Sequence, residues 1–365
     1  MKAFAIGSYG DALRLVDVPE PVARAGQVVV EVEAASLNPL DEKVRAGDLK
    51  MLARHRMPLV LGSDLAGKVV ATGPGVSRFR VGDEVFGKVD LMRIGTLAER
   101  VAVSEMELAA KPRGLSMEGA ASLPLVGLTA WQALVELADV QPGQKVLVHA
   151  GSGGVGTIAI QLARHLGASV ATTASTFNLE LMRSLGAAVA IDYRAEHFTR
   201  LRGYDLVLTS LDTDILERSL GVLRRGGRLI SLSGPPDPTF ARSIGAGWAA
   251  RQIIRARSAR IRRHARRLGI EYSFLFVRSD GEQLARIAEL VENGAIRPVL
   301  DRVMPFERAP DALALLAQRR GPGKIVLSRS SQVAQAAGLS QISPVADLLG
   351  RLNAIEPVTR VPAAR

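Results

Sequence analysis

The sequence of 365 residues contains no cysteine. Disulfide bonds and thiolate chemistry are therefore excluded, and structural zinc loses its commonest ligands. No apolar run approaches the roughly 18 residues that a membrane-spanning helix needs. The N-terminal segment MKAFAIGSYGDALRL also lacks the apolar stretch of a signal peptide. With 23% charged and 47% hydrophobic residues, these absences predict a soluble globular protein with a cytoplasmic location.

Acidic residues are also in deficit. Lys and Arg number 47 and Asp and Glu 36, so the formal net charge is +11. This balance favours anionic partners, and a phosphorylated cofactor, a nucleic acid and a membrane surface all remain open. The length of the chain suits two domains better than one core.

Two patterns divide the chain. From residue 2 to about 112, short β-rich runs alternate with Gly and Pro turns, which is typical of a small all-β or barrel-like unit. From about residue 116, helical segments alternate with short apolar runs, which predicts a parallel sheet covered on both faces. The predicted strands of this sheet are 145–149, 169–173, 188–191, 205–208, 228–233 and 272–277. The β-rich segments RPVLDRVMPF and KIVLS flank a helix expected at 307–319, and these late strands are predicted to rejoin the first domain.

The composition changes again after Ser328, where the polar run SRSSQVAQAAG precedes PVADLLGRL. Val345, Leu348, Leu349 and Leu352 fall at helical spacing, so this extension allows one short amphipathic helix. A poorly ordered tail is the favoured interpretation of residues 329–365, as for other short terminal extensions.

The most informative motif is AGSGGVG, in which Gly151, Gly153 and Gly156 have the Gly-x-Gly-x-x-Gly spacing. The first glycine permits a tight turn, the second allows a pyrophosphate to approach the backbone, and the third allows close helix packing. The run KVLVH precedes the motif, TIAIQLARHLG follows it, and another predicted strand begins at Ser169. This strand-turn-helix-strand context predicts a dinucleotide site with its phosphates at a helix N-terminus. A merely tight turn is the alternative.

The choice between NADH and NADPH is expected at the end of the second strand. An NAD site has an acidic residue about 20 residues beyond the first glycine. Here the first acid along the chain is Glu180, and an acid-free run precedes it: Thr172, Thr173, Ala174, Ser175 and Thr176. Hydroxyls can donate hydrogen bonds to a 2′-phosphate, so NADPH is favoured. Arg183 and Tyr193 are candidates for its remaining partner, although Tyr193 also suits the edge of a core.

Several segments in order resemble the medium-chain dehydrogenase/reductase superfamily, and more narrowly its zinc-free quinone oxidoreductases and alkenal or enone reductases. They are SLNPLDEKVRAGD, LGSDLAGKVVATGPGVSRFRVGDEVFG, LPLVGLTAWQAL, AGSGGVG, LGAAVAIDY, IRPVLDRVMPF and GPGKIVL. The resemblance implies an α/β protein: a GroES-like β-rich catalytic domain (1–120 and 298–328) and a Rossmann doubly wound parallel-sheet domain (121–297). The cofactor would lie in the cleft between them, and a homodimer is expected, with YSFLFV available as an edge strand.

Zinc enzymes of this superfamily carry a Cys within the segment that matches Asn38 to Asp41. They also carry Gly-His-Glu where this chain has Gly62, Ser63 and Asp64. The five histidines are scattered, without metal-ligand spacing. We therefore expect no metal site, and hydride transfer from NADPH to an electrophilic acceptor, a quinone or an α,β-unsaturated carbonyl.

The candidate catalytic residue is Asn38. By resemblance it lies near the nicotinamide, where its amide could donate to a developing anion; a turn residue before Pro39 is the alternative. Relatives often have an aromatic residue where Glu42 stands, so a proton donor is not identified and water is an option. By resemblance, Thr129, Gly234 and Phe274 line the nicotinamide end, or serve only in packing. The full predicted cofactor set is Thr129, Gly151, Ser152, Gly153, Gly154, Val155, Gly156, Ser175, Thr176, Tyr193, Gly234 and Phe274.

One segment has no place in this account. The run RQIIRARSARIRRHARR, from Arg251 to Arg267, contains eight arginines in 17 residues. A solvated helix that covers the sheet is the favoured interpretation. The alternative is a patch for nucleic acid or an anionic membrane, which would suit a binding protein that senses NADPH.

Overall fold

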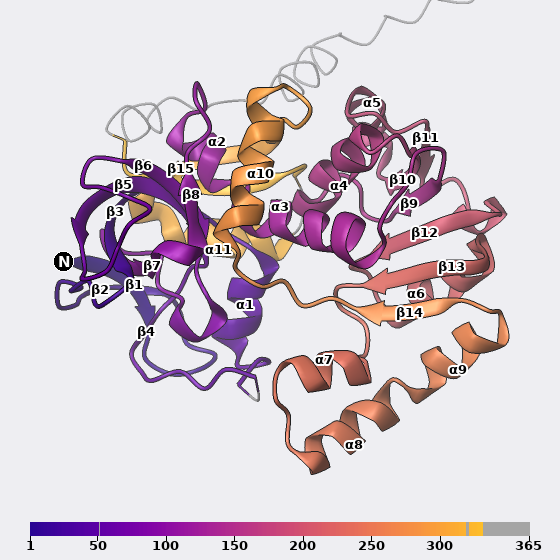
Figure 1. Ribbon diagram of the computed structural model, residues 1–365, viewed down its shortest axis with the longest axis horizontal. Coiled ribbons are helices and arrows are strands. Elements are labelled where there is room, and N and C mark those ends of the chain that lie inside the picture. Colours follow the sequence, from indigo (N-terminus) through magenta and orange to yellow (C-terminus); the bar gives the residue numbers. More distant parts are fainter. Residues whose placement is uncertain (51, 319–320, 331–365) are drawn as a thin grey trace, which may run out of the picture.

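The structure, a computed structural model, describes residues 1–50, 52–318 and 321–330. The predicted helix near residues 345–352 lies outside this range. Figure 1 shows a β-rich region and an α/β region side by side, with three helices that extend below the second. Within the described residues, no helix combines the length and the apolar character needed to cross a membrane.

The β-rich region contains two sheets. The smaller is antiparallel, in the order β2-β1-β4, with the strands β1 (Lys2–Ile6), β2 (Arg14–Asp17) and β4 (Leu59–Val60). The larger has seven strands: β3 (Gln27–Ser36), β5 (Asp64–Thr72), β6 (Glu84–Lys88), β7 (Arg100–Ser104), β8 (Leu108–Ala110), β15 (Leu300–Pro305) and β16 (Lys324–Ser328). Alternate valines of β3 are fully buried, at positions 28, 30 and 32. This period-two pattern gives β3 a core-facing side in the centre of the sheet.

The late strands rejoin the first region, as predicted. Strand β16 pairs antiparallel with β3, where Val326 lies opposite Ser36, and β15 pairs parallel with β16. Helix α11 (Ala309–Gln318) connects β15 and β16 and begins two residues after the predicted start at Glu307, while the predicted end at Arg319 lies outside the described residues. The β-rich region is therefore discontinuous in sequence, while the exact domain boundaries remain a prediction.

The α/β region is built on a six-stranded parallel sheet in the order β11-β10-β9-β12-β13-β14. Its strands are β9 (Lys145–Val148), β10 (Ser169–Ala174), β11 (Val189–Asp192), β12 (Tyr204–Thr209), β13 (Leu223–Ser231) and β14 (Glu271–Phe274). The sequence predicted all six, but the last extends only to Phe274. Beyond Phe274 the chain leaves the sheet, and Leu275 to Val277 line the cleft instead.

Helices connect and flank these strands. The helices before β14 are α2 (Met117–Ala121), α3 (Pro124–Trp131), α4 (Gly154–His165), α5 (Leu179–Ser184), α6 (Thr213–Ser219), α7 (Pro238–Ser243), α8 (Trp248–Arg257) and α9 (Ala259–Arg267). Helix α10 (Gly281–Glu292) follows β14, and its Ile287 side chain packs closely beside Gly127 of α3. The helices α7 to α9 form the extension at the bottom of Figure 1.

Candidate functional site

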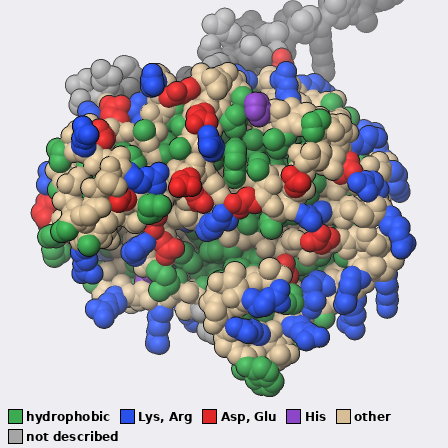
Figure 2. All heavy atoms as spheres, viewed as in Figure 1, with side chains coloured by type: hydrophobic (Ala, Val, Ile, Leu, Met, Phe, Trp, Pro, Cys, Tyr) green, Lys and Arg blue, Asp and Glu red, His purple; other side chains and the backbone are tan. Residues whose placement is uncertain are grey.

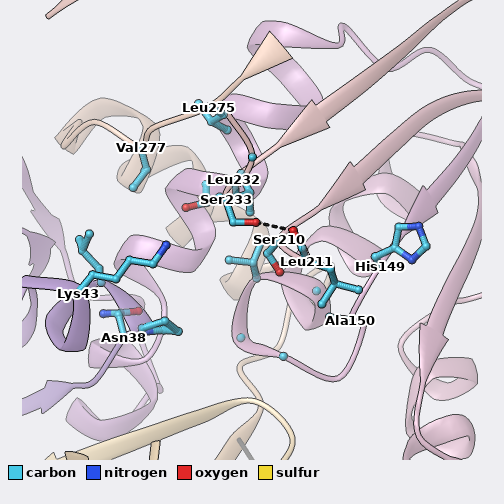
Figure 3. A pocket seen from close by; sticks show the side chains of 18 of the residues that line it. Asn38, Lys43, His149, Ala150, Ser210, Leu211, Leu232, Ser233, Leu275 and Val277 are labelled. Atoms are coloured by element: carbon cyan, nitrogen blue, oxygen red, sulfur yellow. Dashed lines mark hydrogen bonds between the residues drawn. The ribbon is translucent and has the colours of Figure 1, made fainter. Parts of the chain in front are cut away.

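A cavity of about 1640 Å³ lies between the two regions, where both contribute to its lining. One wall is formed by β9, the turn after it and the ends of β12 and β13. The other is formed by α1 (Pro39–Ala46) and its neighbours. In Figure 3, Asn38 and Lys43 lie on one side of the pocket, and Ala150, Ser210 and Leu211 lie on the other. The cavity is large enough for a dinucleotide with a second small molecule.

The glycine turn has the steric features that the sequence predicted. A Cβ on Gly151 would lie 2.0 Å from Thr172 Oγ1, and one on Gly156 would lie 2.5 Å from the carbonyl oxygen of Ala150. By contrast, the nearest atom to a Cβ on Gly153 would be 3.3 Å away. Gly151 and Gly156 are therefore required by the packing of the protein itself. Gly153 is less constrained, since a Cβ there would need a shift of only a few tenths of an ångström, and its place in the cavity lining suits a ligand that approaches the backbone.

Helix α4 begins at this turn and directs its N-terminus into the cavity. The amide groups of Gly154, Val155 and Gly156 belong to the first turn of the helix, where no intrahelical acceptor exists. The backbone amide of Gly323 donates to the carbonyl of Ser152, so β16 and the turn are joined directly. This turn thus presents unpaired backbone amides to the cavity and is held in place by both regions of the chain.

The surroundings of Thr176 differ in one respect from what the sequence predicted. Asp192 ends β11, and its Cα lies opposite that of Ala174 in the neighbouring strand β10. The hydroxyl of Thr176 donates to the Asp192 carboxylate, a hydrogen bond that lowers the pKa of this acid. The expectation that no acid lies near the hydroxyl-rich run is therefore wrong, because parallel pairing brings in an acid from a later strand. The Thr176 proton is directed to Asp192 instead of to a ligand.

Tyr193 and Arg194, the two residues that directly follow Asp192, add a phenol and a guanidinium to this part of the chain. Tyr193 lines the cavity and is 57% exposed. The guanidinium of Arg194 lies 5.8 Å from the centre of the Tyr193 ring. Arg183, the cation expected from the sequence, is on α5, and neither Arg183 nor Arg194 is among the cavity-lining residues of the described chain. The sequence did not single out Arg194 as a site residue, although it stands next to Tyr193 in the chain.

A buried polar cluster, Ser36, Asn38, Asp64 and Lys324, lies beside the opposite wall. Lys324 Nζ donates to the Asn38 side-chain oxygen and lies 3.4 Å from Asp64 Oδ2. Asp64 Oδ2 also accepts from Asn38 Nδ2 and from the Ser36 hydroxyl, each at 2.9 Å. Burial lowers the pKa of Lys324, and Asp64 and Asp41 oppose that effect. The cluster fixes the orientation of the Asn38 amide and leaves its second N–H for another acceptor.

Asp41 and Ser63 form a second pair next to this cluster. The Ser63 hydroxyl donates to Asp41 Oδ1 at 3.1 Å, and the Asn38 backbone N–H donates to Asp41 Oδ2 at 2.7 Å. Burial raises the pKa of Asp41 to about 6. Asn38 thus begins α1 with its backbone, as a turn residue would, while its side chain belongs to the polar cluster.

Glu42, which stands where relatives often have an aromatic residue, is outside the cavity lining, whereas the next residue, Lys43, belongs to it. Glu42 pairs with Arg45 at 2.7 Å, while Lys43 lines the cavity and extends into it in Figure 3. The lysine was visible in the sequence, but α1 had to be placed before its direction was known. Its ammonium group carries protons that an anion in the cavity could accept.

Nine predicted cofactor residues line this one cavity: Thr129, Ser152, Gly153, Gly154, Val155, Gly156, Tyr193, Gly234 and Phe274. Gly151, Ser175 and Thr176 are not among its lining residues. The Thr129 hydroxyl donates to the carbonyl of Leu125, so toward a ligand its oxygen is available as an acceptor. Gly234 donates its amide to the Ser231 hydroxyl, and Phe274 packs edge-on against Phe240.

His149 directly follows β9 and also lines the cavity, although it was not a predicted site residue. Ser219 donates its own proton to Ile215, so His149 Nε2–H must donate to the Ser219 oxygen and Nδ1 must accept from Thr173. Burial lowers the pKa of His149 to about 4. The imidazole is therefore a neutral structural group at neutral pH.

Possible metal ligands do not gather in the described part of the chain. Among those residues, no group of three or more His, Cys, Asp or Glu side chains could hold a metal ion. Ser63 and Asp64 stand where zinc enzymes have His and Glu, and both are hydrogen-bonded within the protein.

Comparisons with known proteins agree with this geometry. Residues 24–113 match the alcohol dehydrogenase GroES-like domain, and residues 185–327 match a family described as zinc-binding dehydrogenase. The chain is 36% identical to the NADPH-dependent alkenal/one oxidoreductase, chloroplastic, of Arabidopsis thaliana, over 90% of this chain and 79% of the relative. It is 33% identical to NAD(P)H oxidoreductase RTN4IP1, mitochondrial, of Danio rerio, over 90% and 91%.

A solved structure gives the same result. The quinone oxidoreductase from Coxiella burnetii superposes with a TM-score of 0.78 at 32% identity, covering 90% of this chain and 99% of that one. Both relatives are more than 30% identical over 90% of this chain, and the solved structure shares its fold. The chain belongs to the medium-chain dehydrogenase/reductase superfamily and is an oxidoreductase with a Rossmann domain for a nicotinamide cofactor.

Proposed function

We propose that the protein is a zinc-independent, NADPH-dependent reductase of quinones or of the activated double bond of α,β-unsaturated carbonyls. The observation that carries this proposal is a single cavity with a glycine turn for phosphates on one wall and hydrogen-bond donors on the other. The names of the relatives in Arabidopsis and Coxiella support the same class of acceptor.

The cofactor would be held mainly by backbone groups. The amides at the start of α4 would face its phosphates, and the lack of a side chain at Gly153 would let them approach the backbone. Thr129, Gly234 and Phe274 line the same cavity, and by resemblance they would lie at the nicotinamide end. When bound there, the reduced nicotinamide supplies a hydride.

The preference for NADPH rests on charge at the ribose end. Asp192 is occupied by the Thr176 hydroxyl and by the backbone N–H of Arg194, at 2.9 Å. Arg194 and Tyr193 lie immediately beyond it, where a guanidinium and a phenol can bind a 2′-phosphate. Ser175 adds a hydroxyl at the end of β10. We infer that Arg194 offsets the repulsion from Asp192 and makes the phosphorylated cofactor the better ligand.

Asn38 and Lys43 are proposed to stabilise the charge that develops on the acceptor oxygen. The Asn38 amide is oriented by Lys324 and Asp64, so its second N–H needs little reorganisation to donate. Lys43 Nζ holds a proton that can pass to the enolate or hydroquinone oxygen. Water is the alternative source of that proton, and the variants below separate the two.

The buried Lys324 would supply positive charge at this wall, as a metal ion does in zinc relatives. Lys324 adds positive charge beside Asn38 and Asp64, within a cluster that already uses the polar atoms of those residues. An unactivated alcohol would still lack a Lewis acid near its oxygen. An acceptor that is already electrophilic needs only donors and orientation, which these residues provide.

The space for the acceptor is predominantly apolar. The side chains that line it come from four segments: Leu40, Leu49, Leu52, Phe240, Ile244, Ile254, Phe276, Leu315 and Leu316. Such a lining favours flat or extended hydrophobic acceptors over small hydrophilic ones. A cytoplasmic location and a homodimer formed through the sheet edge at β14 remain predictions.

The direct test is to follow NADPH absorbance with a panel of quinones, enals and enones, before and after exhaustive chelation. We expect turnover of at least one class, unchanged by chelation. Lys43→Gln should lower the rate about 100-fold if the lysine donates the proton. Glu42→Gln, one residue away and outside the cavity lining, is the matched control and should retain activity. Restoration of activity by zinc, or no turnover of any acceptor, would overturn the proposal.

A further inference from the structure

A basic arm, defined as residues 238–267 and formed by α7, α8 and α9, extends from the α/β region between β13 and β14 (Figure 1). The arm contains nine arginines and no acidic residue. Among these arginines, Arg260 forms a salt bridge in the described structure, with Glu217 outside the arm, at 3.0 Å. Burial and the neighbouring charges of Arg266 and Arg255 lower the pKa of Arg262. The arm is therefore a region of largely uncompensated positive charge.

The arm also exposes large apolar side chains. Trp248 is 78% exposed, Ile253 58% and Ile244 44%. No residue of α8 is buried, whereas α9 buries Ile261 and Ala265 and so anchors the arm to the sheet. A surface helix in a globular protein normally buries its apolar side. In Figure 2, the lowest part of the molecule ends in a hydrophobic patch with Lys and Arg side chains around it.

The two faces of α8 have different surroundings. Ala250, Ile253, Ile254 and Arg257 recur three and four residues apart and line the mouth of the cavity. Trp248, Arg251 and Arg255 project from the opposite face, by the same helical spacing. Ile244, on the preceding turn, lines the cavity as well. Ile244 and Ile253 both line the cavity and are exposed on the arm, so the apolar surface of the cavity reaches the outside of the molecule there.

The composition of this surface selects its partner. A second copy of the chain would place arginines against arginines in a two-fold contact, because the arm offers no acid to pair with them. A nucleic acid backbone would bind the arginines but leave the exposed isoleucines in water. An anionic lipid surface satisfies both, because phosphates bind the arginines while the indole and the isoleucines enter the boundary with the acyl chains.

We propose that the basic arm docks the protein on an anionic lipid surface, with Trp248 at the boundary and the mouth of the cavity beside the lipid. The interaction is reversible and interfacial, since α8 has ten residues and lies along the surface. It is independent of the proposed reductase activity, because no cofactor or acceptor takes part in the docking.

The test is cosedimentation of the full chain with vesicles of phosphatidylcholine alone and of phosphatidylcholine with phosphatidylglycerol. We expect binding only to the second, weakening as salt rises. Arg255→Gln with Arg267→Gln should weaken binding about 25-fold, at roughly five-fold for each arginine. The matched control, Arg14→Gln with Arg24→Gln, removes the same charge from exposed positions in the β-rich region and should change binding less than about two-fold.

The apolar part is tested separately. Trp248→Ala should weaken binding about ten-fold, while Phe177→Ala, an equally exposed aromatic at 76%, should not. Brominated acyl chains should quench the fluorescence of the wild type and leave that of Trp248→Phe unchanged. The proposal is overturned if anionic vesicles are not bound at low salt, or if both arginine pairs matter equally. It is also overturned if Trp248→Ala converts a dimer to a monomer, or if duplex DNA binds and vesicles do not.

Discussion

The two walls of the cavity are built in different ways. The wall from the α/β region relies on backbone: glycines without side chains, and helix amides without partners. The opposite wall relies on buried side chains, above all the ion pair of Lys324 and Asp64. The first wall fails when a side chain is added, and the second fails when one is removed. The comparison shows how one cleft can combine steric recognition of a cofactor with electrostatic stabilisation of an acceptor.

The largest effect is expected on the side-chain wall. Lys324→Met leaves the buried Asp64 carboxylate without its cation, so the free energy of unfolding should fall by about 3–5 kcal/mol. Urea denaturation measures this loss. Lys2→Met, which breaks the exposed pair with Asp17, should cost less than about 1 kcal/mol. Equal losses in the two variants would mean that Lys324 is not an essential partner of Asp64.

Two glycines of the backbone wall should respond differently. Gly156→Ala places a Cβ 2.5 Å from a backbone oxygen and should destabilise the fold by about 2–3 kcal/mol. Gly153→Ala places a Cβ 3.3 Å from the same oxygen, a contact that a small shift relieves, and should lower thermal stability much less than Gly156→Ala, while NADPH affinity falls about ten-fold. Thermal scans and a fluorescence titration measure the two quantities. Unchanged NADPH affinity in Gly153→Ala would show that the phosphates do not approach this residue.

The ribose end of the backbone wall also has a side-chain component. Arg194→Gln should weaken NADPH binding about ten-fold and leave NADH binding unchanged, because only NADPH carries the phosphate that a guanidinium binds. Isothermal titration with both cofactors measures the difference. Arg183→Gln, which removes the same charge from α5, is the control and should bind both as the wild type does. A parallel loss of both cofactors would assign Arg194 a structural role.

The smallest effects concern pH, and the two walls should differ in sign. Burial lowers the pKa of His149 to about 4, below its unfolded value of 6.5, so its contribution to stability is lost as pH falls from 6.5 toward 4. Burial raises the pKa of Asp41 from 3.8 to about 6, so stability is lost as pH rises through 6. Both groups titrate between about pH 4 and 6, where their effects oppose one another.

Unfolding free energies at pH 5 and 7 separate them. When the pH is lowered from 7 to 5, the free energy of unfolding of the wild type should fall by about 2 kcal/mol more than that of His149→Asn. From pH 5 to 7, it should lose about 1 kcal/mol relative to Asp41→Asn. Changes of the same sign in both comparisons would contradict the assignment of a neutral imidazole to one wall and of a buried carboxyl group with a raised pKa to the other.

The backbone wall could be predicted from the sequence because its parts are local. The strand, the glycine turn and the helix after it follow one another from Lys145 to His165, so their spacing defines the site. The six parallel strands and the return of the late strands were also readable, since each has a distinct apolar run.

The side-chain wall could not be predicted in the same way. Asn38 and Asp64 are 26 positions apart, and Lys324 and Asp64 are 260 apart, so only the folded chain joins them. Asp192 reaches Thr176 through parallel pairing, which reversed the inference that no acid lies at the ribose. The arginine-rich run was visible from the start, but the favoured interpretation, a helix covering the sheet, holds only for α9. Helix α8 buries no residue.

The central claim is that the cavity delivers a hydride from the nicotinamide to an activated double bond. The most direct measurement uses NADPH deuterated at C4, in each of its two stereoisomers, with an enone that the enzyme turns over. Mass spectrometry and NMR of the product should find one deuterium on the β-carbon with one stereoisomer and none with the other. Product without deuterium from either stereoisomer, or with deuterium on the carbonyl carbon, would contradict the account.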